Sequence, residues 1–400
     1  MNHYYEVCPY GSLLAEPTRN GIHKGTEYQG KGIPVIKMGE VYDNRVINYV
    51  KRDLYDLSKT EIDKLYVQKE DILFCRTSLV PEGIGHCAIV NDLKEPTTFS
   101  SNLIRARMDK TKVYPNFYRY YFSSPQGIEQ LISIARGTSV TTITGPDISS
   151  LLVPLPPLPE QRAIADVLGA LDNKIELNQK MNANLESLAQ ALFKRSFLDN
   201  PERESWQKKT IGEVVTIMGG TTPSTTNSEY WENGTIQWAT PKDLAPLQNP
   251  FLLKTNSQIT DKGLQQISSG LLLVGTLLMS SRAPIGYLAI AEIPVAINQG
   301  FIAIKCTQEM PNYYMLNWVK ANMDEIIGRA NGTTFLEISK SNFRPIHIEI
   351  PPIEMVKEFN SVVEPLYRKV VANLLESNTL AELRDTLLPK LMSGQVRITV

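Results

Sequence analysis

Apolar residues recur at helical spacing in a long stretch near the middle of the chain. One row repeats every seventh position: Ile164, Leu171, Asn178, Leu185 and Leu192. A second row, with one slip, contains Val167, Ile175, Met181 and Leu188. Two rows sustained over about five heptads are typical of a helix that packs along a partner helix. We therefore expect a helix from about Glu160 to Phe197, with Pro159 in its first turn, where a missing N–H costs nothing.

The same pattern returns near the C-terminus. Each member of its row lies 195 positions after its counterpart in the first row: Phe359, Leu366, Asn373, Leu380 and Leu387. Pro156-Pro157 maps at the same offset onto Pro351-Pro352. A chance alignment of two amphipathic helices would not match the prolines, the apolar row and the asparagine together. We expect a second long helix here, cut off by Pro389.

The segments before the two helices also resemble each other. "IARGTSVTTIT" (134–144) lies over "RANGTTFLEIS" (329–339), and "YPNFYRYYF" lies over "MPNYYMLNW". Both copies contain short β-rich runs separated by Gly, Pro and Asn turns, and we expect one modest helix after Pro115 and Pro311, ending near Gly137 and Gly332. The chain is therefore predicted to be a tandem repeat of the α+β class. Its expected parts are a first unit (1–155), a helix (156–200), a second unit (201–350) and a C-terminal helix (351–400).

This repeat predicts internal pseudo-two-fold symmetry, with the two helices packed as an antiparallel coiled coil. Asn178 and Asn373 lie near the midpoints of their helices and would then face each other. A buried asparagine in such a row selects register and orientation at a cost in stability. The alternative is that each asparagine merely points into a wet groove.

Composition excludes several function classes. The net charge is -1, the four cysteines form no CxxC pair and the four histidines form no HExxH motif. We expect neither disulfides nor a metal site. The N-terminus lacks the pattern of a signal peptide, and the apolar runs are too short to span a bilayer, so we expect a soluble cytoplasmic protein with no membrane partner.

Two similar units joined by stiff helices suit a long target with recurring half-sites, and double-stranded DNA is such a target. Arg and Lys reach guanine, Asn reaches adenine, and hydroxyl groups serve bases or phosphates. Polar residues of these types fall in roughly matched loops of the two copies, although any one of them could equally be a solvated loop residue or part of a salt bridge. The DNA-binding candidates are Lys37, Arg76, Thr77, Ser78, Arg136, Thr138, Ser139 and Thr141 in the first unit, and Thr240, Lys242, Ser281, Arg282, Asn331, Thr333 and Thr334 in the second. In the alignment of the two copies, Lys37 lies close to Lys242, with Thr240 nearby, and Arg76–Ser78 roughly matches 280–282.

The stretch "PLPPLPEQRAIADVLGALDNKIELNQKMNANLESLAQALFKRSF" closely resembles the central helical repeat of the DNA-specificity (S, HsdS-type) subunits of type I restriction-modification systems. The order of unit, helix, unit, helix resembles that family over essentially the whole chain. The second helix departs from the motif, because "PPIEMVKEF" lacks the Glu-Gln pair of the first.

The resemblance implies that each unit is a target recognition domain that reads half of a bipartite, asymmetric DNA site. It also implies that the helices set the spacing and dock two adenine methyltransferase (modification) subunits, with Glu160, Gln161 and Arg162 as partner-binding candidates. A restriction/translocase subunit would complete the holoenzyme. The chain itself would bind no cofactor: S-adenosylmethionine is expected on the methyltransferase, and ATP and Mg²⁺ on the restriction subunit.

The sequence itself favours a chain without catalytic residues. A self-sufficient amino-methyltransferase needs a Gly-rich loop for S-adenosylmethionine and an Asn/Asp-Pro-Pro-aromatic motif, and the nearest match is "QNPF" at 248–251. No GxxxxGK[ST] loop is present. That rival is therefore disfavoured, while a two-armed scaffold that binds no DNA stays open.

Overall fold

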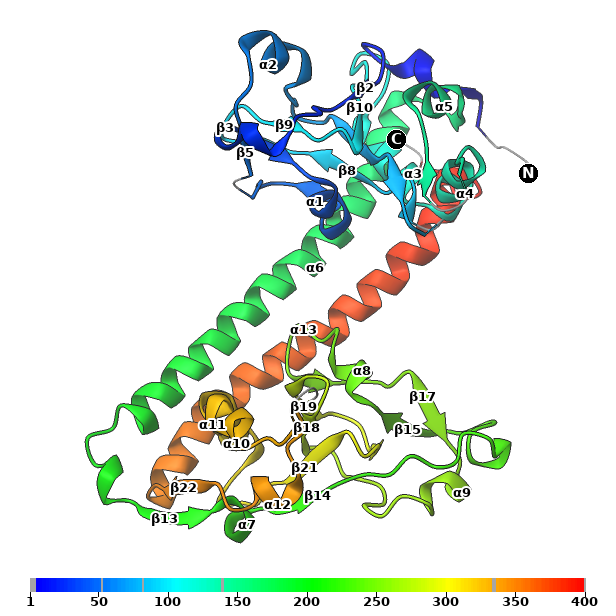
Figure 1. The fold of residues 1–400 in the computed structure, drawn as a ribbon. Coiled ribbons are helices and arrows are strands. Elements are labelled where there is room, and N and C mark those ends of the chain that lie inside the picture. The colour runs from blue at the N-terminus through cyan, green and yellow to red at the C-terminus, as the bar shows by residue number, and fades with distance from the viewer. Residues whose placement is uncertain (1–4, 52, 81–82, 138–139, 333–335, 399–400) are drawn as a thin grey trace. The chain divides into compact units, whose positions relative to one another are not determined.

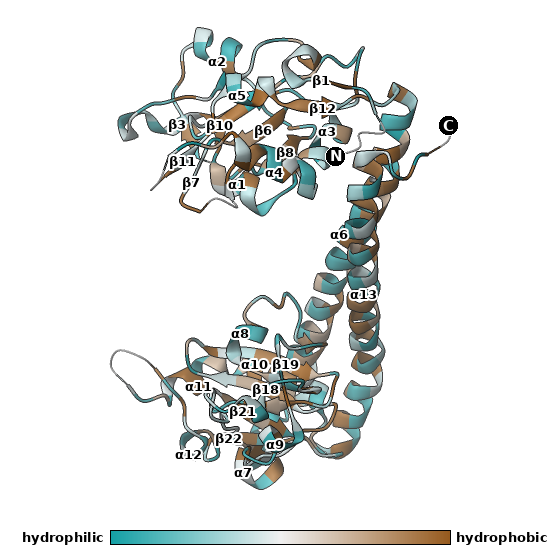
Figure 2. Ribbon diagram, turned by 90° about the vertical axis from the view of Figure 1, so that its right-hand side faces the viewer, coloured by the Kyte–Doolittle hydropathy of each residue, from teal (hydrophilic) through white to brown (hydrophobic). Residues whose placement is uncertain are grey.

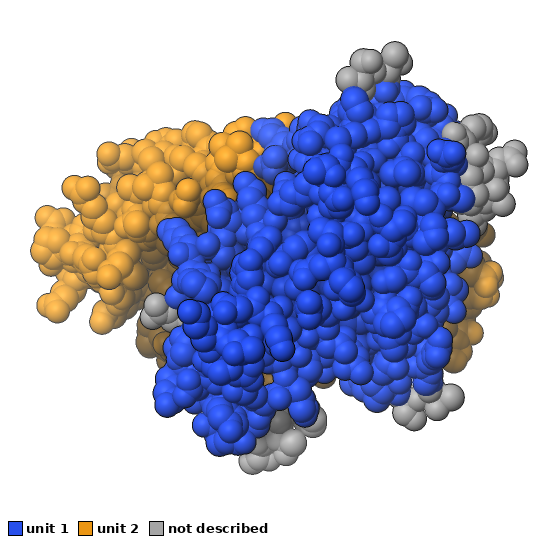
Figure 3. All heavy atoms as spheres, turned by 90° about the horizontal axis from the view of Figure 1, so that it is seen from above, with its two compact units in different colours: residues 1–175, 378–400 blue, residues 176–377 orange. Residues whose placement is uncertain are grey.

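The computed structural model describes residues 5–51, 53–80, 83–137, 140–332 and 336–398. The chain divides into two compact units: residues 1–175 with 378–400 form unit 1, and residues 176–377 form unit 2 (Figure 3). Both division points fall inside long helices, so each unit contains one α+β repeat together with part of each helix. The predicted domain boundaries stay a prediction, because this division groups helix segments by the core they cover.

The two long helices are α6 (Leu158–Phe193) and α13 (Ile353–Ser393). Helix α6 begins two residues earlier than expected, with Pro159 in its first turn, and changes to a π-helical segment at Lys194–Leu198. Pro389 does not cut off α13, so that expectation is wrong. Leu391 and Met392 beyond it are buried in the core of unit 1, and this packing outweighs the one lost backbone hydrogen bond.

Within each unit, segments of α6 and α13 pack antiparallel. In unit 1, Asp172 meets Arg384, while Ile164 shares a core with Leu391. In unit 2, Asn182 meets Asn373, while the rings of Phe193 and Phe359 lie 5.7 Å apart. Partners early in one helix therefore lie late in the other, as predicted for an antiparallel pair.

One of the two predicted rows of α6 faces the core, and the other does not. Ile164 and Asn178 are fully buried, but Val167 and Leu188 of the second row are exposed. The buried second row lies one residue away and reads Gln161, Leu168, Ile175, Asn182 and Ala189, of which all but the half-buried Ile175 are buried. The slip in the apolar pattern concealed this row, because polar Gln161 and Asn182 occupy two of its buried positions.

Unit 1 contains twelve strands and five shorter helices among its described residues. The strands are β1 (Val7–Pro9), β2 (Arg19–Asn20), β3 (Gln29–Ile36), β4 (Val46–Ile47), β5 (Leu54–Tyr55), β6 (Ile72–Cys75), β7 (Thr77–Ser78), β8 (Cys87–Val90), β9 (Thr98–Phe99), β10 (Leu103–Ala106), β11 (Thr141–Thr142) and β12 (Leu152–Pro154). The helices are α1 (Met38–Asp43), α2 (Lys59–Leu65), α3 (Pro115–Phe122), α4 (Pro125–Ser133) and α5 (Gly145–Ser150) (Figure 1).

Unit 2 repeats this series with small changes. Its strands are β13 (Gln207–Thr210), β14 (Thr216–Met218), β15 (Ile236–Ala239), β16 (Phe251–Leu252), β17 (Ser257–Ile259), β18 (Leu277–Ser281), β19 (Ile285–Ala291), β20 (Ala296–Ile297), β21 (Phe301–Lys305) and β22 (His347–Ile350). Its helices are α7 (Ile211–Val214), α8 (Pro241–Leu244), α9 (Asp261–Leu264), α10 (Asn312–Ala321), α11 (Met323–Gly328) and α12 (Lys340–Phe343).

The sheet topologies of the two units match in every sheet except the short β7–β11 ladder, which unit 2 replaces with isolated bridges. The five-stranded sheet has the order β2-β10-β6-β8-β4 in unit 1 and β14-β21-β18-β19-β16 in unit 2, with only the last pair parallel in each. The three-stranded sheets β5-β3-β9 and β17-β15-β20 each combine one antiparallel and one parallel pair. Strands β1 and β12 pair as β13 and β22 do. The internal repeat predicted from the sequence is therefore confirmed.

The central strands are buried on both faces. Along β6, Ile72 and Phe74 belong to one apolar cluster, while Leu73 and Cys75 belong to another. This alternation follows from the two-residue period of a strand. The first of these clusters also contains Ile164 of α6 and Leu388 of α13, so this face of the sheet packs against the long helices. Figure 2 shows hydrophobic residues on the central strands and in patches along α6 and α13.

Each copy has two short helices where one was predicted. In unit 1, Ser124 interrupts the helical segment because its hydroxyl caps α4, accepting a hydrogen bond from the Gly127 N–H, and Pro125 begins the new helix. In unit 2 the break is at Asn322, between α10 and α11. In unit 1 the capping signal of Ser124 and Pro125 is therefore the reason for the difference, whereas the Asn322 side chain does not cap α11.

Asp172 connects three elements of unit 1. Its carboxylate accepts hydrogen bonds from the Tyr120 hydroxyl of α3 at 2.7 Å and from Arg384 of α13 at 2.8 Å. Burial alone raises the pKa of Asp172, but these donors lower it overall. A carboxyl whose pKa is lower in the folded state stabilises the fold above its unfolded pKa, and this stabilisation is lost as the pH falls through the folded value.

We expect Asp172→Asn to lower the free energy of unfolding by about 1–3 kcal/mol at neutral pH, because Arg384 loses its charged acceptor. The difference between this variant and the wild type should shrink as the pH falls below about 4, where the unfolded carboxyl becomes protonated. Denaturant unfolding at several pH values measures both effects. Asp166→Asn, an exposed change on the same helix, is the matched control. An equal loss in both variants would contradict a specific role for Asp172.

Candidate nucleic-acid interface

Unit 1 brings its candidate residues to one edge, around the short ladder of β7 and β11. Thr141 pairs with Ser78, and Thr142 pairs with Thr77. Arg136, three residues after the end of α4, forms a β-bridge with Thr142 and therefore lies beside the ladder. Arg76 immediately precedes β7, and its backbone accepts a hydrogen bond from the Ile143 N–H at 3.0 Å. Residues some sixty positions apart in the sequence therefore share this edge.

Lys37 lies beside the same edge. It precedes α1, and the Thr77 hydroxyl donates to the sulfur of neighbouring Met38 at 3.8 Å. The Lys37 N–H and the Lys51 N–H donate to the buried Glu40 carboxylate at 2.8 Å and 2.7 Å. These bonds hold the backbone around Lys37, while its side chain is part-exposed and pairs with Asp53 at 3.0 Å.

Unit 2 builds the matching corner with Thr240 in the place of Lys37. The Thr240 N–H donates to the buried Asp243 carboxylate at 2.7 Å, and the Asn256 N–H donates to the same group at 2.8 Å. Thr240, and not Lys242, is therefore the structural counterpart of Lys37. Lys242 lies two residues further along, exposed on α8. The alignment of "GIPVIKMGEV" with "TIQWATPKDL" also places Lys37 over Thr240.

The ladder edge of unit 2 is made by Ser281, Arg282, Asn331 and Glu337. Glu337 forms β-bridges with both Arg282 and Asn331. The Ile338 N–H donates to the Ser281 carbonyl at 3.0 Å, as the Ile143 N–H does to Arg76. Ser281 is therefore the counterpart of Arg76, one residue away from the predicted alignment. Ser281 is buried, which leaves Arg282 and the exposed Asn331 to present side chains at this edge.

Four further candidates, Thr138, Ser139, Thr333 and Thr334, lie outside the described residues. Within the described part, the exposed cations at both edges form ion pairs with nearby carboxylates. Arg136 pairs with Asp147 at 2.7 Å, and Arg282 pairs with Glu337 at 3.5 Å. Exposed pairs of this kind contribute little to stability, on the order of 0–1 kcal/mol. Their guanidinium groups can therefore exchange a carboxylate for a phosphate or a guanine at low cost.

The Glu-Gln-Arg motif at the start of α6 is largely internal. Glu160 is buried, receives two hydrogen bonds from Arg397 at 2.6 and 2.7 Å, and a third from the Tyr5 hydroxyl at 3.1 Å. Burial raises the pKa of Glu160, but these donors lower it overall. Gln161 is fully buried and accepts the Tyr114 N–H at 2.8 Å. A partner contact by this motif stays a prediction, and Arg162 is its exposed member.

The two central asparagines lie opposite each other inside unit 2. Both are fully buried rather than in a wet groove. The Asn178 amide donates to the Glu376 carboxylate at 2.9 Å and approaches the Asn373 carbonyl at 3.4 Å. The Asn373 amide donates to the side chain of Asn182 at 2.8 Å. The contact therefore involves a third asparagine that the sequence rows did not reveal, and the register role stays a prediction.

The "QNPF" segment attaches its domain to α6. Asn249 is buried, accepts a hydrogen bond from Asn182 at 3.4 Å and donates one to Glu186 at 3.2 Å. Lys320 of α10 pairs with the same glutamate. These contacts of Asn182, Glu186, Asn249 and Lys320 were not predicted, because the residues are distant in sequence. The one sequence feature that pointed to them was Asn249, a polar residue before a proline.

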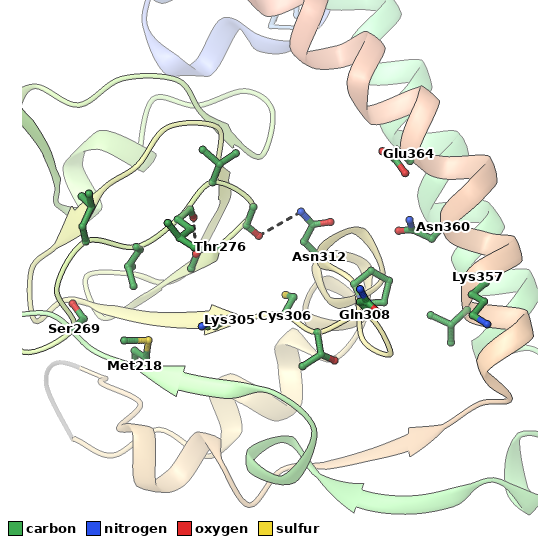
Figure 4. A pocket seen from close by; sticks show the side chains of 18 of the residues that line it. Met218, Ser269, Thr276, Lys305, Cys306, Gln308, Asn312, Lys357, Asn360 and Glu364 are labelled. Atoms are coloured by element: carbon green, nitrogen blue, oxygen red, sulfur yellow. Dashed lines mark hydrogen bonds between the residues drawn. The ribbon is translucent and has the colours of Figure 1, made fainter.

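A cavity of about 1000 Å³ opens in unit 2 between the loop before β18 and the first turns of α13 (Figure 4). It lies at the opposite end of β18 from Arg282. Burial raises the pKa of the Cys306 thiol on its wall to about 12, so this thiol is protonated at neutral pH and is a poor nucleophile.

Across the residues that the structure describes, no cluster of His, Cys, Asp or Glu side chains has the geometry of a metal site. Over the same residues, no helix is both long and apolar enough to span a membrane.

Comparisons with known proteins agree with the repeat. Residues 15–187 and 203–383 each match the family model described as "Type I restriction modification DNA specificity domain". The chain is 26% identical to the type I restriction enzyme MjaIX specificity subunit of Methanocaldococcus jannaschii, covering 93% of this chain and 88% of that one. It is 23% identical to the HindI specificity subunit of Haemophilus influenzae, covering 90% and 94%.

Among solved structures, the S subunit of a type I restriction-modification system from M. genitalium has the same fold. Its TM-score is 0.64 at 18% identity, covering 98% of this chain and 96% of that one. Two matched family domains, relatives aligned over most of their length and this shared fold lead to one conclusion. The chain belongs to the family of type I restriction-modification DNA specificity subunits, which are non-catalytic components of their complexes.

Proposed function

We propose that each recognition domain reads one half of a bipartite, asymmetric site in double-stranded DNA. The observation that carries this proposal is the pair of matched edges with different side chains. Corresponding bridges form at both edges, yet Lys37, Arg76 and Arg136 of one are replaced by Thr240, the buried Ser281 and Asn331 in the other. Matched geometry supports the same mode of docking, and different side chains support different half-sites.

The two exposed arginines provide the sharpest test. Arg136→Ala is expected to weaken or relax recognition at one half-site, and Arg282→Ala at the other, because a lost base contact costs about 1–3 kcal/mol at that position. The measurement is binding of the complex with its methyltransferase to duplexes altered in one half-site at a time, over a range of salt concentrations. Arg368→Ala, an exposed arginine on α13, is the control.

Equal loss at both half-sites would indicate a general phosphate contact or misfolding. Binding with no preferred sequence and no dependence on salt would instead favour a scaffold that binds no DNA.

We also propose that α6 and α13 set the spacing between the half-sites. Both are continuous, at 36 and 41 residues, and polar side chains attach each domain to them. Asp172 attaches α3 in unit 1, and Glu186 attaches α10 in unit 2. A domain fixed to a helix moves with it when that helix is lengthened.

Inserting one heptad into both helices, after Ile175 and after Ser377, should lengthen the gap by up to about three base pairs, because a heptad adds about 10 Å. Each half-site should keep its sequence. Mapping of methylated sites in cells that express the variant measures both properties. A variant with the same gap and an altered half-site would contradict the spacing role.

The helices would also dock two methyltransferase subunits, one for each copy of the repeat. Exposed apolar residues support this, because Val167 matches Val362 and Leu188 matches Leu383 at the repeat offset of 195. Unit 1 therefore displays Val167 and Leu383, while unit 2 displays Leu188 and Val362. S-adenosylmethionine would be bound by these partners, and ATP and Mg²⁺ by a restriction/translocase subunit.

We expect Val167→Ser combined with Leu383→Ser to reduce the number of bound methyltransferase subunits from two to one. Native mass spectrometry of the assembled complex measures this stoichiometry. Leu375→Ser is the control, because Leu375 is an exposed leucine on α13 whose repeat counterpart is Lys180. Retention of both subunits by the double variant, with unchanged affinity, would rule out this surface as the docking site.

A further inference from the structure

An apolar patch lies at the proposed DNA edge of unit 1. Leu79 is 82% exposed, Val80 55% and Val140 47%. Leu79 has the largest exposed fraction of any large hydrophobic residue that the structure describes. These three aliphatic side chains lie among polar and cationic candidates, next to Ser78 and Thr141. Such a group on an otherwise polar edge requires an explanation.

The ladder register places the patch at the tip of a two-stranded ribbon. Thr141 pairs with Ser78, and Val140 and Leu79 are the residues next to this pair in the two segments. The Val80 N–H donates to the Ser78 hydroxyl at 3.2 Å, and the Tyr42 hydroxyl donates to the Gly83 carbonyl at 2.6 Å. The backbone on both sides of Leu79 is thus anchored while the side chain itself is exposed.

On the other strand, the backbone of Gly137 lies close to that of Val140. Gly137 has a φ of 109°, and a Cβ there would lie 2.3 Å from the Val140 carbonyl oxygen. A side chain at this position would clash with the Val140 carbonyl group, so glycine permits this close approach.

Unit 2 makes its ladder differently. The positions of Thr77 and Thr142 are occupied there by Arg282 and Glu337, which form an ion pair. Leu336, the counterpart of Thr141 at the repeat offset of 195, is exposed next to Glu337. The two ladders therefore differ in the side chains that they carry.

The major groove of DNA admits a two-stranded ribbon, and its apolar group is the C5-methyl of thymine. A protein partner fits less well, because a stable protein interface needs about 800 Å² on each side and three aliphatic side chains among cations do not supply it. We propose that Leu79, Val80 and Val140 read the 5-methyl group of thymine within the half-site bound by unit 1. This proposal rests on the proposed reading of one half-site by each domain.

The test uses deoxyuridine, which pairs as thymine does but lacks the methyl group. Each thymine of the recognised site is replaced in turn, and binding by the complex of this chain with its methyltransferase is measured. The wild type should lose roughly three- to tenfold in affinity at a thymine of one half-site, the value of one buried methyl group. The Leu79→Ala, Val140→Ala variant should bind thymine and uracil duplexes equally at that position.

Arg282→Ala identifies which half-site belongs to unit 2, and the sensitive thymine should lie in the other. Leu273→Ala is the control, because Leu273 is 67% exposed in unit 2 on the loop before β18, at the far end of that strand from Arg282. This control should keep the full response to uracil. The single Val140→Ala variant should show an intermediate response.

Three results would overturn the proposal: no effect of uracil anywhere in the half-site of unit 1, an equal effect in wild type and variant, or a half-site without thymine. Increased fluorescence of 2-aminopurine placed beside the patch, with no effect of uracil, would instead show a wedge between bases. In all these cases sequence-selective binding would persist and the proposed function would stand. Binding without any sequence preference would overturn both.

Discussion

The structure depends on apolar burial between segments that lie far apart in the chain. In unit 1, Ile164 and Leu168 of α6 share a core with Leu388 and Leu391 of α13. In unit 2, the last turns of α6 and the first turns of α13 close the core in the same way around Phe193. Each fully buried side chain of this kind contributes about 1.5–3 kcal/mol. Neither recognition domain therefore has a complete core without both long helices.

Polar contacts then fix how each domain sits on its helix segments. Asp172 in unit 1 and Glu186 in unit 2 bond to helices of their own domains, α3 and α10. Buried hydrogen bonds to charged groups are directional, so they select one orientation where apolar burial alone would accept several. The buried carboxylates Glu40 and Asp243 have a similar effect at the edges, where each holds a turn in place by accepting two backbone N–H groups.

The same backbone arrangement therefore carries two edges with different side chains. Strand order and pairing direction agree between the units, because the alternating burial of the central strands constrains them. The edge side chains are under no such constraint, so Arg76 can have Ser281 as its counterpart and Thr77 can have Arg282. The same freedom permits the exposed Leu79 in one unit alone.

By itself, the sequence determined the tandem repeat, the α+β class, the two long antiparallel helices and the family. The heptad period is visible within each helix, and the constant offset of 195 is visible when the two halves are aligned. The matched loops also predicted the candidate arginines and Lys37, and their role in binding stays a prediction. Only the tertiary structure decided which residues face each other: the buried row through Gln161 and Asn182, the continuation of α13 through Pro389, and the true counterpart of Arg76. These depend on packing between distant segments and on loop lengths that shift an alignment by one residue. A one-residue shift moves a strand side chain to the opposite face, so no local pattern could have settled them.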